Sequence, residues 1–198
     1  MNAITTQEIS FEETVKFHGH CCGGLALGYR MAIVAMQRLE AVRAQNDELV
    51  AIVESKVCGV DAIQLVTGCT FGKGNLALRD YGKIACTLFS RKTRKAVRVI
   101  PSLLSSRGQK NRRPDMEMTA RQWIDWTLFA ETDDVLAVHE IPFVVPLRSP
   151  VSRVVTCRSC GELVTKSRMR IKNGRRSCIP CLEEEKESKK NGHFECSC

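Results

Sequence analysis

Apolar residues recur at steps of three and four positions in the first part of the chain, the spacing of a helix that buries one face. The longest such pattern begins at Leu25 and predicts a helix to about residue 45, opened by Gly23 and Gly24. A shorter amphipathic pattern over residues 5–16 predicts a helix before it. Residues 119–129 carry both tryptophans and predict a later helix, which we expect to dock on a sheet.

Shorter runs rich in β-branched and apolar residues predict strands between these helices. Residues 49–56 predict a buried strand, and residues 95–104 predict an edge strand. Residues 76–79 and 83–91 are expected to form a hairpin around the turn at residues 80–82, and residues 133–143 predict the final strand. We therefore expect an α+β fold in which a largely antiparallel sheet packs with a long N-terminal helix.

The composition is that of a globular protein, with 198 residues, 43% hydrophobic and 26% charged. No apolar run reaches the length of a membrane span, and the N-terminus lacks the charge and apolar pattern of a secretory signal. We therefore expect a cytoplasmic protein with no membrane contact. In a reducing compartment, the 11 cysteines are expected to be metal ligands or reactive thiols rather than disulfides.

Prolines at positions 142, 146 and 150 predict a boundary between a core domain, residues 1–150, and a zinc-finger domain, residues 151–198, that ends in a charged tail. The finger contains two CxxC pairs separated by seventeen residues: Cys157, Cys160, Cys178 and Cys181. This spacing brings four thiolates to one tetrahedral zinc ion. A hairpin over residues 163–177, turning at 172–174, and a following helix predict a small treble-clef-like or zinc-ribbon-like module with a structural zinc.

The finger is also strongly basic. Residues 151–181 hold eight lysines and arginines against the single acid Glu162, which suggests an anionic partner or simply a solvated surface. Beyond residue 151 the only aromatic residue is Phe194, so a stacking platform for single strands is missing and only weak, non-specific nucleic-acid binding is expected. His193, Cys196 and Cys198 could ligate another metal, although we expect a plain terminal tail.

The stretch FHGHCCGG at residues 17–24 concentrates ligand-type side chains just before the long helix. His18, His20 and Cys22 alternate along a turn and can converge, and Cys58 and Cys69 could join them. A mixed His/Cys set favours zinc or another transition metal, so a second metal site in the core is expected. The alternative is a nucleophilic Cys–His pair, its thiolate stabilised at the N-terminus of the helix.

The stretch TGCTFGKGN at residues 67–75 resembles a phosphate loop only in part. The glycine spacing is one residue short, and Gly74 stands where a magnesium-binding hydroxyl would be needed, so a nucleotide P-loop is not expected. A glycine-rich anion loop beside Cys69 remains the alternative.

Three motifs together, FHGHCCGGLALGYRMA, CGVDAIQLVTGCTFGKGNL and CxxCGE…CIPC, resemble the FmdE family, whose members are named for formylmethanofuran dehydrogenase. The resemblance spans residues 11–181. It implies an α+β core, a C-terminal zinc finger, a homodimer and a functional cleft at His18, His20, Cys22, Cys58, Asp61 and Cys69. The family's first motif usually has proline where this chain has Gly23.

Formylmethanofuran dehydrogenase reduces carbon dioxide onto methanofuran at a molybdenum or tungsten pterin centre, and this chain is too short to be the catalytic subunit. The resemblance therefore implies an accessory subunit of such a complex, or a stand-alone metalloprotein. One alternative is a nucleic-acid- or protein-binding regulator that uses the basic finger. Another is a thiol enzyme built on Cys22 or Cys69 with His18 or His20, for which Asp61 is a further candidate catalytic residue.

Overall fold

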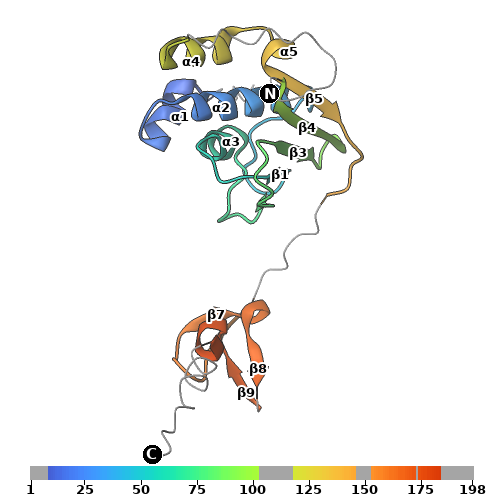
Figure 1. The fold of residues 1–198 in the computed structure, drawn as a ribbon. Helices are drawn as coiled ribbons and strands as arrows, with labels where there is room; N and C mark the ends of the chain where they lie inside the picture. The colour runs from blue at the N-terminus through green and yellow to red at the C-terminus, as the bar shows by residue number, and fades with distance from the viewer. Residues whose placement is uncertain (1–8, 103–117, 146–152, 173, 184–198) are drawn as a thin grey trace, which may run out of the picture. The chain divides into compact units, whose positions relative to one another are not determined.

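A computed structural model describes residues 9–102, 118–145, 153–172 and 174–183. The chain divides into two compact units, residues 1–148 and residues 149–198, which we call the core unit and the finger unit (Figure 1). The predicted ligands His193, Cys196 and Cys198 lie outside the described residues. Among the helices that are described, none is both long and apolar enough to cross a bilayer.

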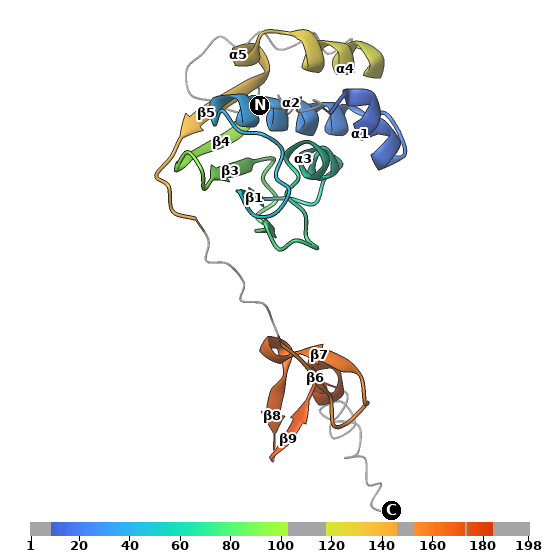
Figure 2. The ribbon, with the colours of Figure 1, turned by 180° about the vertical axis from the view of Figure 1, so that it is seen from behind.

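The core unit is built on a five-stranded sheet with the strand order β2-β1-β3-β4-β5. The strands are β1 (Leu49–Val53), β2 (Leu76–Leu78), β3 (Cys86–Ser90), β4 (Lys95–Pro101) and β5 (Leu136–Glu140). Only β1 and β2 pair in parallel, and the other three pairings are antiparallel. The expectation of an α+β fold with a largely antiparallel sheet is therefore confirmed, and Figure 2 shows β5 at the outer edge beside β4.

The predicted hairpin between residues 76–79 and 83–91 is wrong, because β2 and β3 lie on opposite sides of β1. The backbone N–H of Arg79 donates to the Val53 carbonyl at 2.9 Å, and those of Tyr81 and Lys83 donate to the Glu54 carbonyl at 3.0 and 3.2 Å. The intervening segment thus wraps around the end of β1. Turn residues mark a reversal of the chain in either case, so local sequence cannot distinguish the two arrangements.

The prediction of an edge strand at residues 95–104 is also wrong, since β4 pairs with both β3 and β5. The face of the sheet that holds Val50, Ile52, Phe89 and Ala96 is covered by apolar residues of the segment that follows β5: Ile141, Phe143 and Val145. The opposite face packs against helices. With both faces covered, every residue of β1 and β3 is buried.

Five helices are described in the core unit: α1 (Phe11–His18), α2 (Gly23–Arg38), α3 (Gly59–Thr67), α4 (Ala120–Phe129) and α5 (Thr132–Val135). Helix α2 supplies much of the main hydrophobic core, including Met31, Val34 and Ala35. It ends earlier than the predicted residue 45, because Glu40 adopts a left-handed conformation with φ of 50°. Helix α1 begins later than predicted, at a capping box formed by Ser10 and Glu13.

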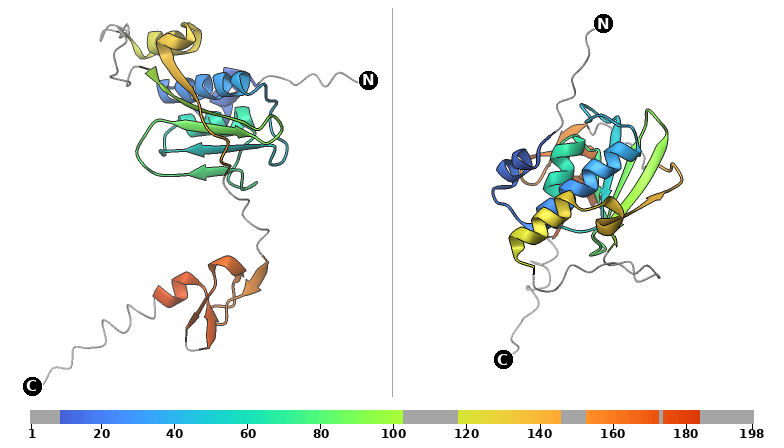
Figure 3. Two further views of the ribbon diagram at one scale, coloured as in Figure 1. Left: turned by 90° about the vertical axis from the view of Figure 1, so that its right-hand side faces the viewer. Right: turned by 90° about the horizontal axis from the view of Figure 1, so that it is seen from above.

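Helix α4 packs on α2 and not on the sheet as predicted, and it forms an outer layer over α2 (Figures 1 and 3). The Arg30 guanidinium of α2 donates to the carbonyls of Leu128 and Ala130 at the end of α4. These carbonyls are the acceptors that a helix leaves without a partner at its C-terminus. Trp123 of α4 also lies directly against Gly23, so that a Cβ at position 23 would stand 2.6 Å from its ring.

The finger unit consists of two small hairpins and a short helical segment. Strands β6 (Val154–Thr156) and β7 (Leu163–Thr165) form the first hairpin, and β8 (Arg170–Lys172) and β9 (Arg175–Ser177) form the second. A single 3₁₀ turn, η2 (Lys166–Arg168), connects the two hairpins, and residues 179–183 are helical. The single hairpin expected over residues 163–177 is therefore wrong in its first half, because β7 pairs with β6, whereas the expected reversal between β8 and β9 is confirmed by the pairing of Lys172 with Arg175.

Candidate metal centre

Four side chains of metal-ligand type converge in the core unit. His18, His20, Cys22 and Cys58 each offer one ligand atom, and these four atoms all lie within 4.8 Å of one another. We call this set the core cluster. Three of its members come from a single short stretch and the fourth from a separate helix, so the cluster joins a local motif to a distant one.

Local structure explains how the first three side chains converge. His18 is the last residue of α1, and Gly19 ends that helix in a left-handed conformation with φ of 97°, which reverses the chain. Cys22 is the N-cap of α2, where its Sγ accepts a hydrogen bond from the N–H of Leu25 at 3.4 Å. His20 lies in the reversal between them, and the imidazole rings of His18 and His20 have centroids 4.5 Å apart.

The fourth ligand is brought in by a close crossing of α2 and α3. A Cβ added to Gly59 would lie 2.9 Å from both the Gly24 carbonyl oxygen and the Gly28 Cα, so glycine is required on α3 at this point. A Cβ on Gly28 would collide with the Gly59 backbone in turn. Because Cys58 is the N-cap of α3, this crossing places its thiol beside that of Cys22, the N-cap of α2.

His18 is held by a carboxylate that belongs to α3. Its Nδ1 lies 2.7 Å from Oδ2 of Asp61, and its side chain is 12% exposed. Its Nε2 is buried and has no hydrogen-bond partner within the described part of the chain. A buried polar atom without a partner is costly, whereas an imidazole that donates from one nitrogen to a carboxylate is oriented to bind a metal through the other. The orphaned Nε2 therefore fits a metal ion in the core cluster.

The thiols of the core cluster interact with each other. Burial raises the pKa of Cys58 above its usual range, and the adjacent Cys22 raises it further. A cation between the sulfurs would reverse this effect, because it favours the thiolates. Two imidazoles and two thiols form a donor set that suits zinc and similar transition metals in tetrahedral geometry. The core cluster can thus bind a metal ion.

Cys69 does not join the core cluster, so the prediction that it is a metal ligand is wrong, and its burial argues against a role as nucleophile. It is fully buried in the hydrophobic core just after α3, where its N–H donates to the Thr67 hydroxyl at 3.1 Å. Burial raises the pKa of its thiol to about 11. Cys86, buried in β3, has its pKa raised to about 12 for the same reason. Both behave as small hydrophobic residues.

The sequence around Asp61 would allow this residue to cap a short helix over residues 62–67, but the structure differs. The helix begins at Gly59, and Asp61 lies in its first turn with its carboxylate turned to His18. Its contribution to the core cluster was implied only by the family resemblance. The sequence did carry a local signal for Asp61. It lies three residues after Cys58, and side chains three positions apart in a helix are neighbours.

The glycine-rich loop at residues 67–75 is held by its own polar side chains. Nζ of Lys73 donates to the carbonyls of Ala44 and Gln45 at 3.0 and 3.3 Å, and Asn75 donates to the carbonyls of Asn46 and Leu49. These contacts anchor the loop to the segment between α2 and β1. An anion site in this loop would need the ammonium group of Lys73, which is instead hydrogen-bonded to backbone carbonyls.

The finger unit contains a second ligand group. The Sγ atoms of Cys157, Cys160, Cys178 and Cys181 all lie within 4.8 Å of one another. The backbone N–H groups of Cys160 and Cys178 lower the pKa of Cys157 to about 6, which favours the thiolate that metals bind. We call this group the finger cluster; it too can hold a metal ion.

A pocket of about 340 Å³ opens beside the core cluster, and we call it the ligand pocket. His18, Cys58 and Asp61 line it together with Lys56, Gln64 and Phe71. Phe71 belongs to the glycine-rich loop at residues 67–75. Its side chain is 57% exposed, whereas those of Lys73 and Asn75 hold the loop in place. Sequence reasoning did not identify Lys56, Gln64 or Phe71, because nothing in their local pattern relates them to the two histidines.

Fold and clusters together define an α+β protein with one His/Cys cluster in its core and a four-cysteine finger. The chain belongs to the FmdE family, whose model, described as "FmdE, Molybdenum formylmethanofuran dehydrogenase operon", matches residues 17–137. All members of the core cluster lie within that match, whereas the finger cluster lies beyond it.

Two individual proteins are similar to this chain. An FmdE-like protein of Syntrophus aciditrophicus, named for tungsten formylmethanofuran dehydrogenase, shares the fold at a TM-score of 0.64 and 24% identity, over 93% of this chain and 98% of that one. A protein of Archaeoglobus fulgidus named "Probable S-adenosyl-L-methionine-binding protein" is 31% identical in an alignment 188 residues long, gaps included, that covers 84% of this chain. The chain spans only 50% of that relative's length.

Proposed function

We propose that the core cluster binds one zinc or other transition-metal ion, and that this ion is the functional centre of the protein. The orphaned Nε2 of His18 carries the proposal, since Asp61 occupies Nδ1 and the remaining nitrogen is buried among thiols. The finger cluster is proposed to bind a structural zinc. Four thiolates complete a tetrahedral shell and leave no position for a ligand.

The residues of the core cluster have unequal roles in this proposal. His18, Cys22 and Cys58 are partly buried and fix the ion, whereas His20 is exposed and can give up its position to an incoming ligand. The Asp61 carboxylate accepts a hydrogen bond from Nδ1–H of His18 and keeps the imidazole ring oriented. A bound ion would supply Lewis acidity at the wall of the ligand pocket.

Elemental analysis of the purified chain tests the proposal. The wild type should hold two metal equivalents per chain, and the double variant His20→Ala/Cys22→Ser should hold one. Cys21→Ser is the matched control, because this exposed neighbouring thiol lies outside the core cluster, and it should keep both equivalents. Equal metal content in the wild type and the double variant would refute a metal site here.

The thiol-enzyme alternative predicts a different result in the same proteins. Metal content would be unchanged, iodoacetamide would label Cys22 unusually fast at neutral pH, and His18→Ala would slow the labelling. The regulator alternative rests on seven exposed basic residues of the finger unit: Arg153, Arg158, Lys166, Arg168, Arg170, Arg175 and Arg176. The affinity of the chain for duplex DNA and its dependence on salt and sequence test that alternative.

The biological setting that we propose is molybdenum- or tungsten-dependent one-carbon metabolism of the formylmethanofuran dehydrogenase type. The family description and the name of the S. aciditrophicus protein both refer to that enzyme. An accessory subunit should co-purify with the enzyme complex, whereas a stand-alone relative should not. A homodimer is proposed for either case, and sedimentation equilibrium measures it. S-adenosylmethionine is a further ligand to titrate, because the A. fulgidus relative is named for it.

A further inference from the structure

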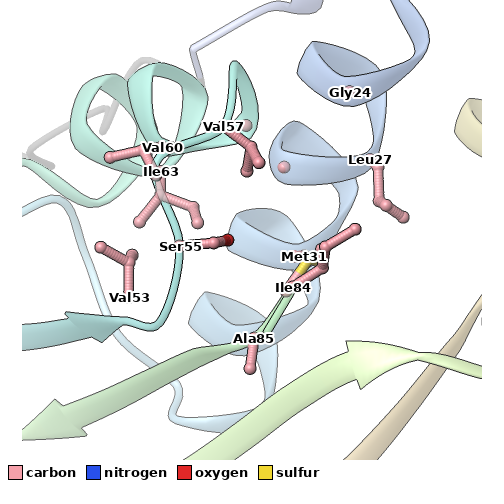
Figure 4. A pocket seen from close by; sticks show the side chains of 12 residues that line it. Gly24, Leu27, Met31, Val53, Ser55, Val57, Val60, Ile63, Ile84 and Ala85 are labelled. Carbon is pink, nitrogen blue, oxygen red and sulfur yellow. The ribbon is translucent and has the colours of Figure 1, made fainter. Parts of the chain in front are cut away.

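A second cavity, of about 130 Å³, lies between α2, α3 and the end of β1 (Figure 4). Its wall is apolar and includes Leu27, Met31, Val57, Ile63 and Ile84. Ser55 contributes the single polar side chain among the residues that line it. We call it the apolar cavity. An engineered cavity of comparable size and lining in another protein binds benzene, so a space of this kind can take a small apolar group.

The apolar cavity adjoins the ligand pocket. The two share Val53, Ser55, Val57 and Val60 as lining residues. Gly59 lines the apolar cavity, and its neighbour Cys58 lines the ligand pocket as a member of the core cluster. An ion in the core cluster would thus lie at the polar end of a space whose other end is hydrophobic.

We propose that the ligand of this site is a small amphiphile, with a metal-binding donor group such as a carboxylate and an aliphatic tail of about four to six heavy atoms that fills the apolar cavity. The donor group belongs in the ligand pocket, beside His18 and Lys56, because burying it among Leu27, Met31 and Ile63 would leave it without partners. The donor half of this inference rests on the proposed metal site, and the tail half rests on the cavity alone.

Straight-chain carboxylates from acetate to octanoate test the proposal on the full chain loaded with Co²⁺, whose visible spectrum reports ligands at the ion. Affinity should rise about fourfold for each CH₂ group, the factor that corresponds to 0.8 kcal/mol, and should level off once the cavity is full. Co²⁺ in the finger cluster, which has no position for a further ligand, contributes absorption that stays constant during the titration. Affinity that does not change with chain length would overturn the proposal.

Two variants locate the effect. Ala85→Leu fills the apolar cavity and should abolish the dependence on chain length, whereas Ala77→Leu, on β2 and packed with the opposite face of the sheet, should preserve it. If Ala85→Leu fails to fold, Ile84→Phe takes its place, because Ile84 lines the apolar cavity but not the ligand pocket and, at 37% exposed, tolerates a larger side chain. An unchanged dependence in the cavity-filling variant would overturn the assignment of the tail.

Butanol separates failure of this inference from failure of the metal site. It has an aliphatic tail but no strong donor, and it can be titrated into the variant His20→Ala/Cys22→Ser while the Met31 methyl group is observed by NMR. A saturable shift that Ala85→Leu abolishes supports the tail site even if the core cluster binds no metal. If the wild-type chain holds both metal equivalents but butanol causes no shift at Met31, the tail site is overturned and the metal site is not.

Discussion

Asp61 and His18 lie 43 residues apart in the sequence, yet the Asp61 carboxylate holds Nδ1 of His18 at 2.7 Å. The contact joins the first turn of α3 to the last residue of α1. It fixes the protonated nitrogen of the imidazole on the carboxylate side and leaves Nε2 to the core cluster. A contact of this kind orients a metal ligand without touching the metal.

Asp61→Ala should therefore weaken metal binding by the core cluster about 10- to 100-fold and leave the finger cluster unchanged. Asp61→Asn, which keeps an acceptor oxygen, should recover part of the affinity. Competition titration with a chromophoric chelator measures both. Asp80→Ala is the control, since Asp80 pairs with Lys56 at the surface and should have no effect. Wild-type affinity in Asp61→Ala would show that the contact is merely structural.

Gly28→Ala should destabilise the core unit, because the added methyl group meets the backbone of Gly59 and forces α2 and α3 apart. The cost expected for such overpacking is about 1–3 kcal/mol in the free energy of unfolding. The separation also moves Cys22 away from Cys58, so metal affinity of the core cluster should fall. Gly72→Ala, which places its methyl group in open space, is the control for urea denaturation and metal titration.

Cys69 and Cys86 should resist alkylation in the native protein, because burial raises the pKa of their thiols to about 11 and about 12. Mass spectrometry after iodoacetamide treatment at pH 8 should find them modified only when urea is present. The raised pKa values also mean that the folded chain keeps protons that the unfolded chain releases. Stability should therefore be lost as pH rises from about 9 toward 12, and Cys86→Ala should reduce this loss.

Cys160→Ser should unfold the finger unit and leave the core unit folded. Metal binding supplies most of the folding free energy of such small modules, on the order of 10 kcal/mol. Near-UV circular dichroism follows the core tryptophans Trp123 and Trp126, and their thermal transition should keep its midpoint. Loss of that transition together with the finger zinc would mean that the two units fold as one.

The finger unit should bind nucleic acid only weakly and without sequence preference. Each phosphate that its exposed basic residues neutralise should contribute about −0.9 to the slope of log affinity against log salt on duplex DNA. Fluorescence anisotropy between about 50 and 200 mM salt measures the slope with unrelated duplexes of equal length. Tight binding of one duplex at physiological salt would instead favour the regulator function.

Local spacing alone predicted the features that depend on near neighbours. The apolar periodicity after Leu25 predicted α2, and the alternation of His18, His20 and Cys22 predicted their convergence, which the structure brings about. The two CxxC pairs likewise predicted the grouping of the finger cysteines. In each case, short-range geometry limits where the side chains can lie, so residues a few positions apart must meet.

Tertiary packing decided what the sequence left open. Cys58 and Cys69 were equal candidates, and only the crossing of Gly28 with Gly59 brings Cys58 to the core cluster while Cys69 is buried beside the sheet. The pairing of β2 with β1, and the contact of Asp61 with His18, were decided in the same way. Residues this far apart meet only when whole helices and strands pack, and the fit between those elements is not encoded in any short stretch of the chain.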